Sequence, residues 1–172
     1  MTRETFAPFG HILGADDVAP DYKSAGSIGW RAPLVIAGMP ELISIKTDWS
    51  GLIVSKLERH FNVTQAFFPL AGGPAAVLVA EPTSVTNPHD IPTADRVRAF
   101  LVIPGIAYVL HLGTWHSLDR YPLIHGCLSV AMLTEAETTR ADPGPEGGNL
   151  TQEIDYSKEF NLRFEIVPAG DI

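Results

Sequence analysis

The chain reads LERHFNVTQAFFPLAG from Leu57 to Gly72. Side chains alternate along a strand, so Glu58 and His60 are expected to share one face while Arg59 points to the other. The second half of the stretch is apolar and aromatic, and a Gly- and Pro-containing turn follows it. The stretch therefore predicts a strand that carries a carboxylate and an imidazole on one face, followed by an apolar strand.

Apolar runs of strand length recur along the rest of the chain, separated by turns rich in Gly, Pro and Asp. They lie at Leu42–Ile45, Gly51–Lys56, Ala75–Ala80, Val97–Ile103, Ile106–Leu112 and Gly126–Leu133. This spacing is typical of an all-β sandwich or barrel. Leu42–Ile45 is expected to end in a turn at residues 46–48.

Few helices are expected. One short helix is predicted near Pro92–Arg98, with Thr93 as a possible cap. Polar residues predict a surface loop over Thr134–Asn149, and Arg163–Val167 is expected to form a late edge strand. No segment resembles an interdomain linker, so residues 1–172 are expected to form a single domain with a carboxyl-terminal extension.

A second constellation stands at His111-Leu112-Gly113-Thr114-Trp115-His116. It resembles the second cupin motif, Pro-x-Gly-x-x-His, with His111 at the proline position. The pattern Glu-x-His-x4-Gln-x-Phe-x-Pro-x2-Gly, from Glu58 to Gly72, resembles the first cupin motif. The resemblance implies a cupin-type β-barrel, also called a double-stranded β-helix or jelly roll. Both motifs would line its interior, so His116 would face Glu58, His60 and Gln65.

The run from Leu57 to Gly72 also closely resembles the signature region of ureidoglycolate lyases. Further matches keep the chain order and together cover roughly residues 6–133. They are Phe9-Gly10, Leu42–Ile45 followed by Lys46, Val77–Ala80, Val97–Phe100, His111 and Trp115-His116. The resemblance implies a carbon–nitrogen lyase that cleaves ureidoglycolate to glyoxylate and urea, a reaction of allantoin and purine catabolism.

This reaction needs a base, an acid and a cationic group for the substrate carboxylate. His116 or His60 is the expected base, because imidazole suits proton transfer near neutral pH. Glu58 is expected to orient a histidine or to take part in the proton transfer. Gln65 is expected to hydrogen-bond the ureido group or the glyoxylate carbonyl.

Four further residues are candidates for substrate binding: Lys46 or Arg31 for the carboxylate, with His111 and Trp115 beside the site. Taken alone, Trp115 is more typical of a core residue, and the neighbours Glu58 and Arg59 are compatible with a simple surface ion pair.

A metal site is the competing arrangement for the same side chains. Glu58, His60, Gln65 and His116 could ligate a divalent cation, although Gln is a weaker ligand than the Glu usual at its position. The chemistry requires no redox cofactor, and a divalent metal is the one cofactor that the residues suggest.

The formal net charge of −8 opposes attraction to nucleic acid or anionic lipid. A small anionic substrate remains compatible with it, provided that some of the 12 basic residues gather locally. The longest apolar runs are too short to span a bilayer, and the first residues show no signal sequence, so a cytoplasmic location is the default. Pairing through edge strands predicts a homodimer.

Two alternatives stay open. Ser117 and Leu110 stand where the family usually has His and Tyr, and the chain continues about forty residues beyond the last matched strand. A related enzyme acting on another small ureido, hydroxy- or keto-acid is therefore the first alternative. The second is a non-catalytic cupin that binds a small carboxylate.

Overall fold

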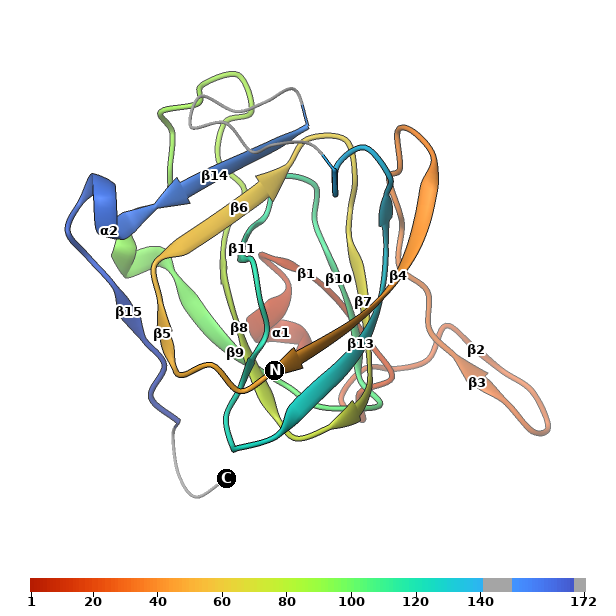
Figure 1. The fold of residues 1–172 in the computed structure, drawn as a ribbon. Coiled ribbons are helices and arrows are strands. Elements are labelled where there is room, and N and C mark those ends of the chain that lie inside the picture. The colour runs from red at the N-terminus through yellow and green to blue at the C-terminus, as the bar shows by residue number, and fades with distance from the viewer. Residues whose placement is uncertain (141–149, 169–172) are drawn as a thin grey trace.

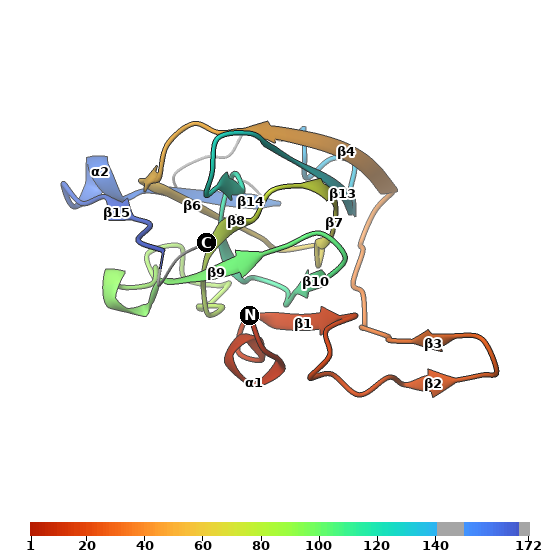
Figure 2. The same ribbon diagram turned by 90° about the horizontal axis from the view of Figure 1, so that it is seen from below.

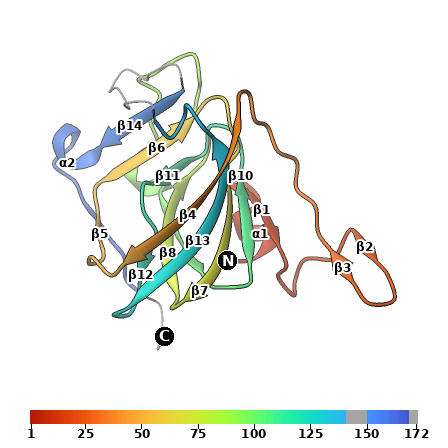
Figure 3. The ribbon, with the colours of Figure 1, turned by 45° about the vertical axis from the view of Figure 1, so that its right-hand side comes forward.

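The computed structural model describes residues 1–140 and 150–168, and most elements in this part of the chain are antiparallel strands (Figure 1). The first sheet has the order β1-β10-β7-β13-β4, with β1 at Gly10–Leu13, β10 at Ala107–Leu110, β7 at Ala66–Gly72, β13 at Cys127–Glu135 and β4 at Pro40–Asp48. Figure 3 shows β4, β13 and β7 side by side.

The second sheet has the order β12-β8-β11-β6-β14. Its strands are β12 (Tyr121–Pro122), β8 (Ala75–Ala80), β11 (Trp115–Ser117), β6 (Lys56–His60) and β14 (Thr151–Asp155), and β9 (Arg98–Val102) also pairs with β8. The prediction of an all-β, cupin-like fold is confirmed by these antiparallel sheets.

The remaining elements are small. The strands β2 (Tyr22–Lys23) and β3 (Ile28–Gly29) form a hairpin that extends away from the two sheets (Figure 2), and β5 (Ile53–Val54) pairs with β15 (Phe164–Glu165). The described helices are α1 (Arg3–Phe6), α2 (Tyr156–Glu159) and the 3₁₀ turn η1 (Ala94–Arg96). None of them has the length and apolar composition needed to cross a membrane.

The main core lies between the two sheets. Phe67 and Leu128 from the first sheet pack with Val77 and Val79 from the second, and all four side chains are buried. We call the sheet faces that meet here the inner faces. Burial of apolar surface on this scale is the main source of stability in such a fold.

A second core covers the outer face of the second sheet. Leu57, Leu78 and Trp115 point to this face and pack against Tyr156 and Ile166 from the carboxyl-terminal segment. The expectation of a core role for Trp115 is confirmed by its complete burial.

Several predicted boundaries differ from the structure. The strand predicted at Leu42–Ile45 extends as β4 through Asp48, without the predicted turn, because β13 pairs with it along its whole length. At the other end of that ladder, Thr134 and Glu135 complete β13 and are buried, so they do not belong to a surface loop. Residues 141–149 of the predicted loop lie outside the described residues.

Other predictions agree more closely. The short predicted helix is the 3₁₀ turn η1, although the Thr93 side chain makes no capping hydrogen bond. The predicted late edge strand is β15. The turn glycine Gly72 has a φ of 111°, a conformation that side chains rarely adopt, and a Cβ there would collide with the Cys127 carbonyl oxygen.

Arg59 shows how strongly β6 is embedded in the fold. Its side chain is completely buried on the outer face, 4.6 Å from the Trp115 ring centroid, so the interpretation as a surface ion pair is wrong. The guanidinium donates to Gln152 Oε1 at 2.7 and 2.9 Å and to the carbonyl oxygens of Thr83 and Ser84 at 3.0 and 3.1 Å. Arg59 therefore ties the segment after β8 to both β6 and β14.

Replacing Arg59 by Met should lower the free energy of unfolding by about 3 kcal/mol, because buried acceptors lose a charged donor. Urea denaturation measures this loss. Lys56→Met is the control on the same strand, since the Lys56 ammonium is partly exposed in its ion pair with Glu153 and should contribute less than about 1 kcal/mol. Equal losses in the two variants would contradict the role given to Arg59.

Candidate active site

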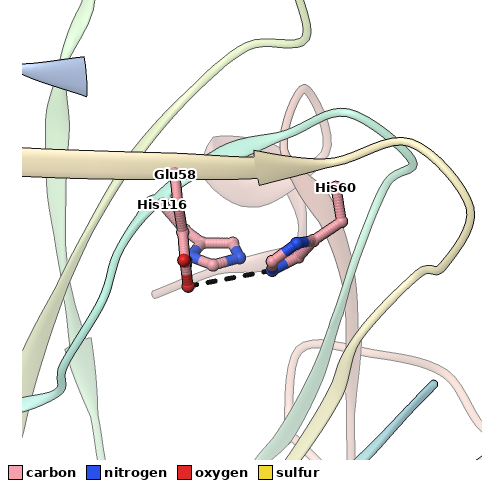
Figure 4. A group of neighbouring side chains, drawn as sticks. All are labelled: Glu58, His60 and His116. Carbon is pink, nitrogen blue, oxygen red and sulfur yellow. Dashed lines mark ion pairs between the residues drawn. The ribbon is translucent and has the colours of Figure 1, made fainter. Parts of the chain in front are cut away.

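Three titratable side chains meet on the inner face of the second sheet. Glu58 and His60 come from β6, and His116 lies directly opposite Glu58 on the neighbouring strand β11. Figure 4 shows the carboxylate beside both rings. Glu58 Oε1 lies 3.7 Å from His60 Nε2 and 3.7 Å from His116 Nδ1, and the two ring centroids are 5.1 Å apart. Strand alternation therefore places Glu58 and His60 together, as the sequence predicts.

These side chains line a cavity of about 250 Å³ with two different walls. The polar wall includes Glu58, His60, Gln65, His116, Asp119, Arg120 and the threonines Thr47, Thr138, Thr139 and Thr151. The apolar wall comes mainly from the first sheet and includes Ile45, Phe67, Val130 and Met132. Such a cavity suits a small ligand with several polar groups.

The histidine hydrogen bonds leave both Nε2 atoms free. His116 Nδ1 lies 3.2 Å from the Ser117 carbonyl oxygen, which can only accept, so Nδ1 carries the proton and Nε2 a lone pair. His60 Nδ1 lies 2.9 Å from Thr151 Oγ1. Both Nε2 atoms are buried and have no hydrogen-bond partner among the described residues.

Burial sets the charge of the site. It lowers the pKa of His60 to about 4, helped by Arg120, and lowers the pKa of His116 well below its usual value. Burial raises the pKa of Glu58 to about 7, although Arg120 opposes this shift. At neutral pH, two neutral imidazoles therefore flank a carboxyl group that can either give or take a proton.

The raised pKa of Glu58 gives a prediction for stability. In the folded state Glu58 is stabilised as the neutral acid. Its contribution to the free energy of unfolding is therefore complete below pH 4.5 and is lost as the pH rises through about 7. Glu58→Gln removes this loss, so the variant should gain stability relative to the wild type between pH 5 and pH 8, by up to about 3 kcal/mol.

Urea denaturation in the presence of a chelator tests this at both pH values. Glu4→Gln changes an exposed glutamate and serves as the control. A difference between Glu58→Gln and the wild type that stays the same from pH 5 to pH 8 would refute the assigned shift.

Arg120 is a site residue that sequence reasoning missed. Its buried guanidinium stacks 3.9 Å from the Phe67 ring centroid, and it donates to the Tyr108 hydroxyl and, at 3.0 Å, to the Ser117 carbonyl oxygen. Its second terminal nitrogen, Nη2, is buried and has no partner in the described part of the chain. The one signal in the sequence is that Arg120 follows His116 by four residues.

The two basic residues expected to hold a carboxylate lie elsewhere. Lys46 is exposed on the outer face of β4, because its neighbours Ile45 and Thr47 face the cavity. Arg31 is exposed and lines a different hollow near the amino terminus, together with Arg3. Both expectations are corrected by these positions.

His111 and Trp115 also lie outside the cavity lining. His111 Nε2 is 2.9 Å from the Ala7 carbonyl oxygen, and its ring packs edge-on against His11. Trp115 points to the outer face, since His116 next to it points inward. Of the predicted site residues, the structure thus brings together Glu58, His60, Gln65 and His116.

The same cluster fits a divalent metal ion. Glu58, His60 and His116 each offer one ligand atom, and these atoms all lie within 4.8 Å of one another. Imidazole nitrogens and a carboxylate are donors that first-row transition metals accept, and both histidine Nε2 atoms lack a hydrogen-bond partner among the described residues. Gln65 lines the same cavity and adds an amide oxygen to the possible set.

Comparison with known proteins identifies the family of the chain. A sequence model of the family described as ureidoglycolate lyase matches residues 1–119. A protein named ureidoglycolate lyase from Pseudomonas fluorescens (strain Pf0-1) is 37% identical over 126 residues, covering 67% of this chain and 71% of the relative. One of the same name from Pseudomonas aeruginosa (strain LESB58) is 33% identical over 126 residues, covering 67% and 70%. The resemblance found in the sequence is thereby confirmed, and the chain belongs to the ureidoglycolate lyase family.

Proposed function

We propose that this protein is a lyase that cleaves the carbon–nitrogen bond of ureidoglycolate to give glyoxylate and urea. The observation that carries the proposal is the joint position of two imidazoles, the Glu58 carboxyl and the Arg120 guanidinium in the lining of one cavity, with His60 Nε2, His116 Nε2 and Arg120 Nη2 lacking hydrogen-bond partners among the described residues. Family membership supports the same reaction.

The reaction is an elimination that these groups can balance. A base removes the proton of the substrate hydroxyl, and the oxygen electrons form the carbonyl of glyoxylate. The carbon–nitrogen bond breaks, and its electron pair remains on the ureido nitrogen. An acid then protonates that nitrogen, so urea leaves as a neutral molecule.

His60 or His116 is the proposed base, because both imidazoles line the cavity and are neutral at neutral pH, and the Nε2 of each has no hydrogen-bond partner among the described residues. Glu58 is the proposed acid. It lies between the two rings, and burial raises its pKa to about 7, so a large fraction of it carries a proton near neutral pH. Its carboxylate can then recover the proton from a neighbouring imidazole.

Arg120 replaces Lys46 and Arg31 as the proposed partner of the substrate carboxylate, since its guanidinium lines the polar wall and its Nη2 has no partner among the described residues. The Gln65 amide, whose Nε2 lies 3.4 Å from Thr134 Oγ1, is proposed to hydrogen-bond the ureido group. These contacts would hold the substrate in one orientation.

A divalent metal, if bound, would be held by Glu58, His60 and His116, with Gln65 as a fourth donor. It would supply a Lewis acid that polarises a substrate oxygen. Metal analysis of the purified protein, with and without chelator treatment, measures its occupancy.

The central test is an assay of the purified protein with ureidoglycolate that follows glyoxylate and urea separately. The proposal expects one urea for each glyoxylate. Ammonia released in place of urea would point to hydrolysis of the ureido group and would overturn it.

The apolar wall favours a second candidate within the same family. Ile45, Val130 and Met132 offer no hydrogen bonds to a compact polar substrate, so another small ureido, hydroxy- or keto-acid with an apolar substituent would fill the cavity better. A panel of such acids in the turnover assay separates the two candidates.

The proposed partner is a small anionic metabolite rather than nucleic acid, in a cytoplasmic step of allantoin and purine catabolism. We further propose a homodimer formed through an edge strand. β4 supports this, because it is the last strand of the first sheet in the described part of the chain. Sedimentation should give twice the 18.6 kDa chain mass, and a monomer would contradict the dimer.

A further inference from the structure

The site includes strands that lie beyond the residues covered by the family match, and β14 is one of them. The match ends at residue 119, whereas β14 spans Thr151–Asp155. β14 pairs with β6, and its register places Thr151 directly opposite His60 and Gln152 opposite Arg59. Thr151 therefore faces the cavity, and Gln152 faces outward.

Thr151 stands at the end of a chain of hydrogen bonds. Its Oγ1 lies 2.9 Å from His60 Nδ1 and donates to the Thr138 carbonyl oxygen at 3.5 Å. The Thr138 amide in turn donates to Glu135 Oε2 at 2.9 Å, and Asn62 Nδ2 donates to the same oxygen at 3.1 Å. All of these residues except Asn62 are buried.

The Glu135 carboxylate is the final acceptor in this series of hydrogen bonds. Burial raises its pKa, but the hydrogen bonds from Thr138, Glu137 and Asn62 outweigh burial and leave the pKa at about 2. The carboxylate is thus a permanent acceptor at neutral pH, and it holds Thr138 in the position where the Thr138 carbonyl oxygen accepts the hydrogen bond from the Thr151 hydroxyl.

The donor-to-acceptor direction of these hydrogen bonds selects one tautomer of the His60 ring. When the Thr151 hydroxyl donates to the Thr138 carbonyl oxygen, 3.5 Å away, its Oγ1 accepts from His60, and Nδ1 then carries the ring proton. The opposite tautomer would bury an Nε2–H group for which the described residues supply no hydrogen-bond partner, with Glu58 Oε1 at 3.7 Å.

We propose that Thr151, held through Thr138 by Glu135, is a positioning residue that keeps the His60 ring in the Nδ1–H tautomer with its Nε2 lone pair directed into the cavity. The segment after the family match would thus complete the site. The consequence for turnover rests on the proposed lyase function, whereas the tautomer can be observed without substrate.

The test compares chelator-treated wild-type protein with Thr151→Val and Thr151→Ser. Valine keeps the shape of threonine and removes the hydroxyl, whereas serine keeps the hydroxyl. Long-range proton–nitrogen NMR correlations assign the ring tautomer, and we expect Nδ1–H in the wild type and in Thr151→Ser, with Nε2–H appearing in Thr151→Val. With ureidoglycolate, Thr151→Val should lose about 10–100-fold in kcat with little change in KM, and Thr151→Ser should recover most of it.

Gln152→Met is the matched control. It weakens β14 on the opposite face through the lost Arg59 hydrogen bonds, so it should destabilise the protein while leaving the His60 tautomer and kcat unchanged. A wild-type His60 in the Nε2–H form, or an unchanged tautomer in Thr151→Val, would overturn the inference. If the wild type released no glyoxylate, the proposed function would fail, and the NMR result would still decide the inference.

Discussion

His116→Gln is expected to lower kcat for ureidoglycolate by about 10²–10⁴-fold, the range for loss of a general acid or base. His116 is buried beside Glu58, and its Nδ1 proton is held by the Ser117 carbonyl, so Nε2 carries the lone pair that would act as the base. Glutamine has a similar volume but no basic nitrogen, so the loss should appear in chemistry more than in packing.

His89→Gln is the control, because this histidine is exposed and remote from the cavity lining. Circular dichroism and thermal unfolding of both variants show whether the fold is kept. Turnover within a few-fold of the wild type in a folded His116→Gln protein would remove His116 from the mechanism.

Arg120→Met should lower kcat/KM by at least about 30-fold, which corresponds to the lower end of the roughly 2–5 kcal/mol found for removing one partner of a buried charge pair. Most of the effect is expected in KM, because the substrate carboxylate is present in the ground state as well as in the transition state. Arg120→Lys should restore little of it, since the ammonium cannot reproduce the fork of donors that contacts Tyr108 and Ser117.

Lys46→Met and Arg31→Met are the informative controls for this prediction. Both side chains are exposed and lie outside the cavity, so their removal should leave KM near the wild-type value. A large rise in KM for either control, together with a small one for Arg120→Met, would return the carboxylate site to the residues that the sequence suggested.

Much of the fold was predictable because apolar runs and turn residues are local properties. β8, for instance, is a continuous apolar run that is buried along its whole length. The pairing of Glu58 with His60 was predictable for the same reason, since alternation along a strand needs no knowledge of the neighbours. The position of His116 opposite them came from the cupin resemblance.

The missing parts depend on contacts between distant segments. β14 reads Thr-Gln-Glu-Ile-Asp and has no apolar alternation, because Gln152 hydrogen-bonds a buried arginine and Thr151 a histidine. Arg120 follows β11 in a short connection that looks solvent-exposed in the sequence, and only its stacking on Phe67 shows that it turns inward. Lys46 looked suitable as a basic residue beside a strand, but its side of β4 was set by the pairing with β13.

The second core also sets a lower limit on how far the chain can be shortened. A protein cut after β13 would retain the residues of the family match but lose Tyr156 and Ile166, which cover Leu57, Leu78 and Trp115. A contiguous apolar surface would then face water and favour aggregation. The smallest catalytic unit of this protein should therefore include β14 and the segment through Ile166, even though the match to its relatives ends well before them.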